Sequence, residues 1–463
     1  MNFELYQSPF SWRYGSDDMR RIWSEENKRL TYRKLWAALA RIQSSFGLVT
    51  QEQVDDLTAN IENINIDRAL EIESEIHHDL MAEIKAFAEQ CSIGGGIIHL
   101  GATSDDIKDN TDILRIRQSL DILLEKIQSL LLAFTKKIDT YANLPIMAYT
   151  HLQPAEPTTL GYRLAFYAQD ILISFKEIKS TRAQLRGKGF RGAVGTSASF
   201  SELIGIENLE KFDALMSEEL NLPFFEVTTQ TYPRKQDYQV VSALSSLGSS
   251  LYKFAFDLRI LQSPMFGEVS EPFKKKQVGS SAMPFKRNPI KAENIDSLGR
   301  YLAQLPRLAW DNAAHSLFER TLDDSGNRRI MLPESFLVTD ELLKVSRGIL
   351  EGFQVNKDVA KKNFDKYGPF AATERLLMAL SKKGADRQEM HEQIRKHTLA
   401  AWDEVQKDNP NPLTQSMTND KGFLKYLSIV EIENCLDASK YIGDAPKRAM
   451  KLAQHIKEMI SFD

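Results

Sequence analysis

From Ala102 to Leu144 the sequence contains neither glycine nor proline. Within this stretch, apolar residues recur at intervals of three and four, which is the repeat of one face of an α-helix. They are Ile113, Ile116, Leu120, Leu123, Ile127, Leu130, Phe134 and Ile138. A helix of 28 residues is about 42 Å long. The pattern therefore predicts a long rod whose apolar seam must be covered.

Three further seams have the same kind of spacing. They run from Val240 to Leu261, from Val338 to Ile349 and, more weakly, from Leu164 to Ile178. Other helices of the chain can cover such seams in a bundle, and so can another subunit; the spacing leaves both open. The 463 residues include only 23 glycines and 16 prolines, well below the average share of about 12 %. This shortage argues against sandwiches and propellers, which need many turns.

The rest of the chain predicts shorter helices at 32–46, 51–60 and 67–91, and no β alternation of note. Gly94–Gly96 interrupts the pattern before the long rods begin, and short amphipathic segments follow residue 355. We expect an all-α fold with three helical domains. These are an N-terminal domain (1–102), a central long-helix bundle (103–355) and a small C-terminal domain (356–463).

Charge and cysteine content narrow the functional classes. A net charge of −4 disfavours a nucleic-acid partner. Cys91 and Cys435 are far apart and form no CxxC pair, which suits a reducing compartment. The N-terminal residues carry charges without an apolar core, so no signal peptide is expected. No run approaches 18 apolar residues. These features predict a cytoplasmic protein without a membrane partner.

The stretch with the most chemical character is Gly279-Ser-Ser-Ala-Met-Pro-Phe-Lys-Arg-Asn-Pro289, which follows three lysines at 274–276. Two hydroxyls, two cations and an amide fall within eleven residues. Backbone N–H groups in such a small-residue loop suit a carboxylate or a phosphate. On composition alone, an ordinary polar loop between helices is equally compatible.

This stretch resembles the GSSxMPxKxNP signature of the fumarase/aspartase superfamily. Other segments are similar to one member, the adenylosuccinate lyase family. They are Trp12–Ser16, His77–Asp79, His99–Ser104, Thr150–Ala155, Thr229–Lys235 and Glu319–Ser325. The resemblance runs from about residue 10 to 330.

The resemblance implies a reaction, namely β-elimination of fumarate from adenylosuccinate and from the succinyl-carboxamide ribotide of purine synthesis. It also implies a homotetramer in which the long-helix bundle forms the core and three subunits build each site. The segment around 263–285 would then be a mobile lid. No cofactor is implied.

The resemblance further assigns catalytic roles. Ser280 would be the general base, with Lys286 and loop amides stabilising its alkoxide. His151 would be the general acid, because an imidazole can donate a proton near neutral pH. Glu293 would pair with that histidine. His78 would orient the substrate.

The remaining expected residues bind the substrate. Arginine forks and hydroxyls suit phosphate and carboxylate groups. The expected phosphate ligands are Arg13, Tyr14, Ser325 and Arg329; the expected carboxylate ligands are Lys286, Asn288 and Arg320; further contacts are His77, Asp79, Thr103, Ser104, Thr150 and Gln230. His77-His78-Asp79 could suggest a metal, but no other ligand spacing supports one, so no metal is expected.

Two departures affect details of substrate contact. Asn294 and His77 stand where some relatives carry arginine. Two alternatives also remain: another fumarate-releasing lyase, such as an argininosuccinate lyase, and a catalytically silent structural oligomer. Intact Ser280, His151 and Lys286 speak against the silent oligomer.

Overall fold

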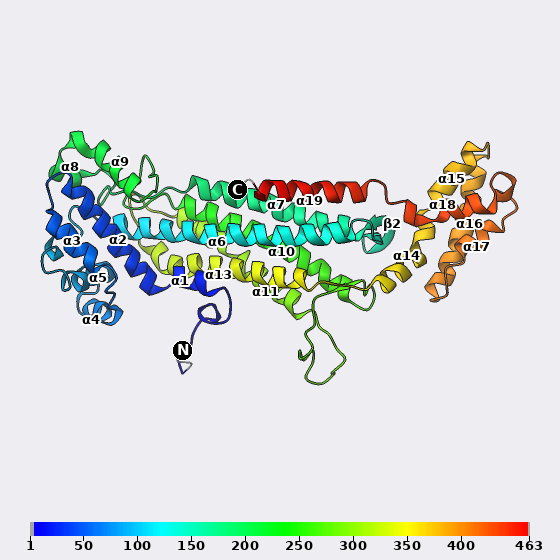
Figure 1. Cartoon of the computed structure of the whole chain (residues 1–463), viewed down its shortest axis with the longest axis horizontal. Coiled ribbons are helices and arrows are strands. Elements are labelled where there is room, and N and C mark those ends of the chain that lie inside the picture. Colours follow the sequence, from blue (N-terminus) through cyan, green and yellow to red (C-terminus); the bar gives the residue numbers. More distant parts are fainter. Residues whose placement is uncertain (1–3, 462–463) are drawn as a thin grey trace. The chain divides into compact units, whose positions relative to one another are not determined.

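The computed structural model describes residues 4–461, and helices dominate it (Figure 1). This confirms the predicted all-α class. The described chain divides into two compact units. Unit 1 comprises Met1–Ile127, Ser174–Ser249 and Leu298–Lys344, and unit 2 comprises Gln128–Ile173, Ser250–Ser297 and Val345–Asp463. The division of the sequence into three domains stays a prediction.

Five helices contribute residues to both units. They are α6 (Ser104–Tyr141), α7 (Leu160–Gln184), α10 (Lys235–Gln262), α11 (Ile290–Leu302) and α13 (Asp323–Glu351). The predicted seams are buried within the chain itself, since all eight residues of the first seam are 0 % exposed. Most residues of the other three seams are buried as well. Another subunit is therefore not needed to cover the seams.

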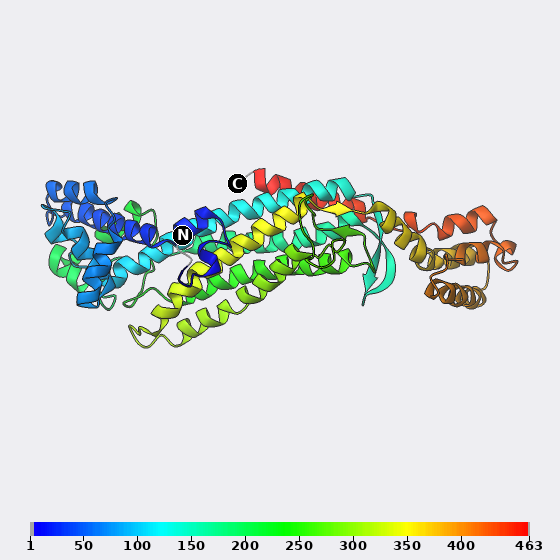
Figure 2. The same cartoon turned by 90° about the horizontal axis from the view of Figure 1, so that it is seen from below.

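In unit 1, α13 runs beside α6 (Figure 2). Charged contacts join the two helices, because Lys126 pairs with the buried Asp340 and Arg328 contacts Asp112 at 3.2 Å. The other helices of this unit are α1 (Asp17–Ile22), α2 (Glu25–Ser44), α3 (Gln51–Asn60), α4 (Ile66–Ile76), α5 (Asp79–Ala88), α8 (Ala198–Ile204), α9 (Leu209–Glu219) and α12 (Leu305–Ala314).

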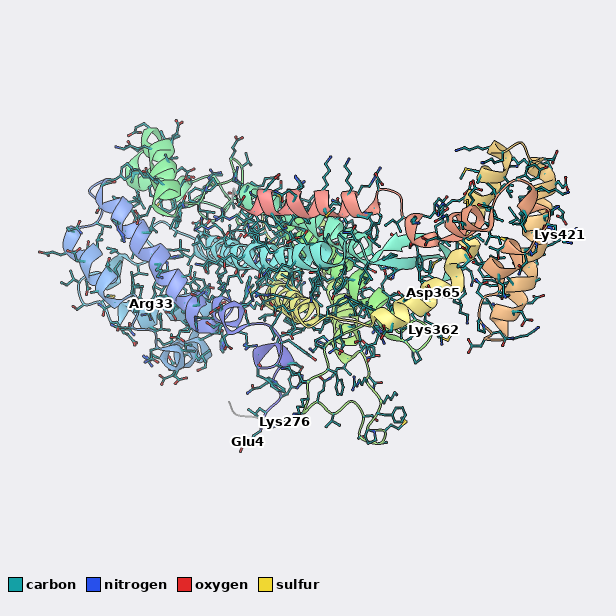
Figure 3. The ribbon with its side chains drawn as sticks, turned by 45° about the vertical axis from the view of Figure 1, so that its right-hand side comes forward. Glu4, Arg33, Lys276, Lys362, Asp365 and Lys421 are labelled. Carbon is teal, nitrogen blue, oxygen red and sulfur yellow. The ribbon has the colours of Figure 1, made fainter. Side chains whose placement is uncertain are left out.

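Apart from the seams of the long helices, unit 1 contains an apolar core that joins α2, α3 and α5 around Trp36 and Phe87. The rings of these two residues stack at 6.2 Å. Arg33 lies among these helices (Figure 3), fully buried over the Phe87 ring. Its Nε lies 2.8 Å from Glu83, which also binds Arg29 at 2.5 Å. The buried carboxylate is thus shared by two arginines and ties α2 to α5.

The helix predicted at 67–91 is in fact two helices, α4 and α5. His77 ends α4 in the left-handed conformation, at φ 55°. His78 then caps α5, because its Nδ1 accepts the Met81 N–H at 3.2 Å. His77 and His78 therefore separate α4 from α5, although neither residue type by itself indicates the end of a helix. The helix predicted at 51–60 matches α3, which begins with a capping box between Thr50 and Gln53.

Unit 2 contains strands that the sequence reading missed. Strands β1 (Pro145–Thr150) and β2 (Gln153–Thr159) form an antiparallel hairpin, and β3 (Val269–Ser270) pairs with β4 (Gln354–Val355). The prolines within β2 argue against a strand in the sequence, because proline has no backbone N–H to donate. The helices of this unit are α14 (Lys357–Ala371), α15 (Thr373–Lys382), α16 (Arg387–Gln406), α17 (Leu413–Thr418), α18 (Ile429–Leu436) and α19 (Ala445–Ser461).

Between β3 and α11, the segment 271–289 has no regular structure and extends from the neighbouring helices as a loop (Figure 1). Lys276 lies on this loop (Figure 3). None of the helices within 4–461 is both long and apolar enough to cross a membrane.

Candidate active site

Unit 1 contains a cavity of about 720 Å³, within the size range of small-molecule sites. Residues from α2, α4, α5, α6 and α13 line it, together with residues from the segments between helices. Nine of the residues expected from the sequence meet here: His77, His78, Asp79, Thr103, Ser104, Gln230, Arg320, Ser325 and Arg329. The structure therefore brings together segments separated by more than 200 residues. Arg13 and Tyr14 belong to the same unit but are not part of this lining.

The first turn of α6 forms part of the cavity wall. Ser104 begins the helix, and the Thr103 N–H donates to Asp106 Oδ2 at 2.8 Å. This contact holds the turn that carries Thr103 and Ser104 into the lining. The N-terminus of a helix also bears partial positive charge from unpaired N–H groups, which favours anionic groups.

His78 caps α5, and the hydrogen bond that it accepts there determines its tautomer. A ring nitrogen that accepts a hydrogen bond carries no proton. Because Nδ1 accepts from Met81, the neutral ring carries its proton on Nε2. With the ring half-exposed at the cavity wall, His78 can donate a hydrogen bond from Nε2, which suits an orienting role.

Arg320 is held by two carboxylates. It lies 2.8 Å from Asp324 and 3.4 Å from Asp105. Asp324 in turn binds the buried Arg234 at 2.8 Å. Both oxygens of Asp324 are thus engaged, and the planar guanidinium of Arg320 is fixed at the wall.

A buried charge network lies behind this wall. Arg234 contacts Asp109 at 3.1 Å, and Asp109 also accepts the Tyr232 N–H at 2.9 Å. Burial raises the pKa of Asp109, and the opposing charge of Arg234 lowers it in part. Arg328 binds Asp237 at 2.8 Å. These pairs connect α6, α10 and α13.

Sequence reasoning missed this network and also Lys108, which lines the cavity. The one feature of the sequence that could have indicated the network is the run of aspartates at 105, 106 and 109, directly after Thr103-Ser104. Such a run usually marks a solvated helix face, and its arginine partners lie more than 100 residues away. Only the fold brings them together.

The six other expected residues belong to unit 2: Thr150, His151, Ser280, Lys286, Asn288 and Glu293. Thr150 ends β1, and His151-Leu152 form the two-residue turn to Gln153. Both turn residues have positive φ, at 54° and 60°, which is the type I′ geometry of tight hairpins. The turn leaves the His151 side chain exposed.

Ser280 lies in the loop before α11. Its Oγ accepts two backbone N–H groups, from Met283 at 3.0 Å and from Ala282 at 3.3 Å. The ends of the loop approach closely at Gly279, where an added Cβ would lie 2.0 Å from the Lys286 carbonyl oxygen. Only glycine is compatible with this contact. Asn288 Nδ2 donates to the Gly279 carbonyl at 3.2 Å.

Lys286 is exposed on the same loop. Glu293 lies on the first turn of α11, 3.9 Å from Arg259. Its expected pairing with His151 remains a prediction. Within residues 4–461, no group of three or more His, Cys, Asp or Glu side chains is arranged to hold a metal ion.

Known proteins are similar to this chain over most of its length. A family model described as "Lyase" matches residues 13–301, and one described as "Adenylosuccinate lyase C-terminus" matches 369–451. The chain is 38 % identical to the adenylosuccinate lyase of Schistosoma mansoni, with 96 % of this chain and 93 % of the relative covered. This chain belongs to the adenylosuccinate lyase family. It is therefore a lyase.

Two further members show how widely the family extends. The adenylosuccinate lyase of Saccharomyces cerevisiae is 37 % identical over 98 % of this chain and 95 % of its own. That of Pyrococcus abyssi is 36 % identical over 97 % and 98 %.

Solved structures share the fold. A fumarate lyase from Mesorhizobium sp. BNC1 has a TM-score of 0.83 at 24 % identity, with 97 % of this chain and 99 % of the other covered. A 3-carboxy-cis,cis-muconate lactonizing enzyme from Pseudomonas putida has a TM-score of 0.85 at 23 % identity, with 98 % and 100 % covered. The predicted fumarase/aspartase-like fold is thus confirmed.

Proposed function

We propose that this chain removes fumarate from adenylosuccinate, giving AMP, and from the succinyl-carboxamide ribotide, giving the carboxamide product. The observation that carries the proposal is the cavity in unit 1 that gathers nine expected residues from distant segments. Family relatives that match over nearly the whole chain support the same reaction. No cofactor is part of the proposal.

The reaction begins with removal of a weakly acidic proton beside a carboxylate. Ser280 takes this proton in our proposal. A serine alkoxide forms only where its charge is stabilised. The two N–H groups that donate to Ser280 Oγ supply such stabilisation, because hydrogen bonds to a charged form favour it. Lys286 and Asn288 follow on the same loop and would bind the substrate carboxylates.

Loss of the C–N bond then requires a proton on the leaving nitrogen. His151 is the proposed donor, paired with Glu293. Its place in a type I′ turn presents the ring to solvent and to an incoming substrate. Arg320, fixed by Asp324 and Asp105, binds a carboxylate, and His78 donates from Nε2.

The nucleotide phosphate would bind to arginines and hydroxyls. Ser325 and Arg329 line the cavity, and Arg13 and Tyr14 belong to the same unit. His77, Asp79, Thr103, Ser104, Thr150 and Gln230 complete the proposed substrate contacts.

The proposal also includes a homotetramer with shared active sites and a cytoplasmic location. Tyr162, Phe166 and Ile173 are 39 %, 54 % and 57 % exposed and share one face of α7. Exposed apolar rows of this kind favour contact between subunits. The expectation is that mixing Ser280→Ala subunits with Arg320→Ala subunits restores activity, because hybrid oligomers rebuild some complete sites. Mixtures that stay inactive although hybrids form would contradict shared sites.

The function is tested by release of fumarate from both succinyl nucleotides, with argininosuccinate as the comparison substrate. We expect turnover of the two nucleotides and none of argininosuccinate. Cleavage of argininosuccinate alone would assign the chain to the other lyase, and no turnover of any substrate would favour the silent oligomer.

Ser280→Ala tests the assignment of the base. We expect kcat to fall by at least about a hundredfold, as removal of a general base typically does, with the oligomeric state unchanged. Ser281→Ala is the matched control, since it removes a hydroxyl from the same loop. Near-native turnover of Ser280→Ala would refute the assignment.

A further inference from the structure

Lys108 lies on the second turn of α6, in the wall of the unit 1 cavity. No role follows for it from the sequence. Its Nζ donates to Asp79 Oδ1 at 2.6 Å, and its side chain is 25 % exposed. A lysine in this setting is a partly desolvated cation, so its charge is screened less than on an open surface.

The cations of this cavity differ in how they are compensated. Arg234, Arg320 and Arg328 each lie within 3.4 Å of two carboxylates. Lys108 and Arg329, in contrast, share Asp79, with Arg329 Nη2 at 2.9 Å from Oδ2. In residues 4–461, neither has another carboxylate partner within 4 Å. The group formed by Lys108, Arg329 and Asp79 therefore carries one positive charge in excess.

Unused donors accompany this excess charge. A lysine has three N–H donors and an arginine five. The contact with Asp79 engages one nitrogen of each side chain. Burial raises the pKa of Asp79, but the hydrogen bond and charge of Lys108, the Leu80 N–H and the charge of Arg329 outweigh burial and hold this pKa at about 2. The carboxylate therefore stays ionised and keeps both cations in place.

We propose that Lys108 is a substrate-binding residue that, together with Arg329, receives an anionic oxygen group of the substrate. The group is the phosphate or a succinyl carboxylate, since both present charged oxygens. Asp79 then positions the two cations, in addition to its proposed contact with the substrate. The inference deepens the proposed function and rests on it.

The test compares Lys108→Met with Lys136→Met, which removes an exposed lysine from the same helix. A hydrogen bond to a charged group is worth enough that its loss raises KM for adenylosuccinate by at least about tenfold. We expect kcat to change much less, and Lys108→Arg to recover most of the affinity. Lys136→Met should behave like the native enzyme.

Calorimetric titration with AMP and with fumarate separates the two anions. Weaker AMP binding by Lys108→Met with unchanged fumarate binding identifies the phosphate, and the reverse identifies a carboxylate. Unchanged KM and unchanged binding of both ligands, in a variant that retains the native melting temperature, would overturn the inference. A native enzyme that does not cleave adenylosuccinate would instead refute the proposed function, and the two failures are therefore distinguishable.

Discussion

We expect His99 to make the stability of the protein depend on pH in the mildly acidic range. The imidazole is largely enclosed, and its Nδ1 accepts the Trp36 indole N–H at 3.1 Å. Burial lowers the pKa of His99 from 6.5 to about 4, with a smaller contribution from His78. Protonation at Nδ1 would also break the bond with Trp36. The folded protein therefore holds this ring neutral.

The sign of the effect follows from the two pKa values. Between pH 6.5 and 4 the unfolded chain binds a proton that the folded chain does not, so the free energy of unfolding falls as pH falls. The full difference is about 3 kcal/mol at 1.36 kcal/mol per pKa unit. Between pH 7.5 and 5.0, about 2 kcal/mol of this is lost. Below pH 4 no further loss arises from His99.

The assay is urea unfolding at pH 7.5 and 5.0 for the native protein, His99→Gln and His391→Gln. Glutamine can still accept from Trp36 but does not titrate. Other groups contribute equally in all three proteins, so only the differences matter. We expect His99→Gln to lose about 2 kcal/mol less than the native protein over this interval. His391, exposed on α16, serves as the control. Equal losses in all three proteins would show that the reasoning is wrong.

Two further predictions concern the charge networks. Arg320→Lys should lower kcat/KM for adenylosuccinate by at least about tenfold, because a lysine cannot reproduce the planar fork; steady-state assays at several substrate concentrations measure this, and native kinetics would exclude Arg320 from substrate binding. Glu83→Gln should lower the free energy of unfolding by about 3–5 kcal/mol, because it leaves Arg33 buried without a counter-charge and Arg29 with only Glu25, at 3.9 Å. Denaturant titration against the exposed Glu62→Gln provides the comparison, and similar midpoints would contradict a stabilising role.

The long helices could be predicted because their cause is local. A 43-residue stretch without glycine or proline, with apolar residues every three or four positions, has few other folds available. The hairpin around His151 was missed for an equally physical reason. Its strands contain three prolines, and the tight turn uses His151 and Leu152 in place of the usual Asn-Gly. The break between α4 and α5 was missed as well, because His77 and His78 are both compatible with a continuous helix.

Candidate site residues could be named from the sequence by the segments that resemble the adenylosuccinate lyase family. Nine of them line one cavity. The sequence could not show that Asp79 holds Lys108 and Arg329, or that Asp324 links Arg320 to Arg234. Apart from the Arg320–Asp324 pair, which is four positions apart, these contacts join residues between 29 and 250 positions apart, and no local pattern encodes them.

The sequence by itself determined the helical class, the positions of the rods and the chemical character of the loop at 279–289. Helical periodicity and turn chemistry depend on neighbours a few residues away, so they can be recognised along the chain. The tertiary structure decided which charges meet. It covers the seams within the chain, buries the arginine–carboxylate network and leaves two cations sharing one carboxylate at the cavity wall. That balance depends on distances between side chains of different helices, which only packing determines.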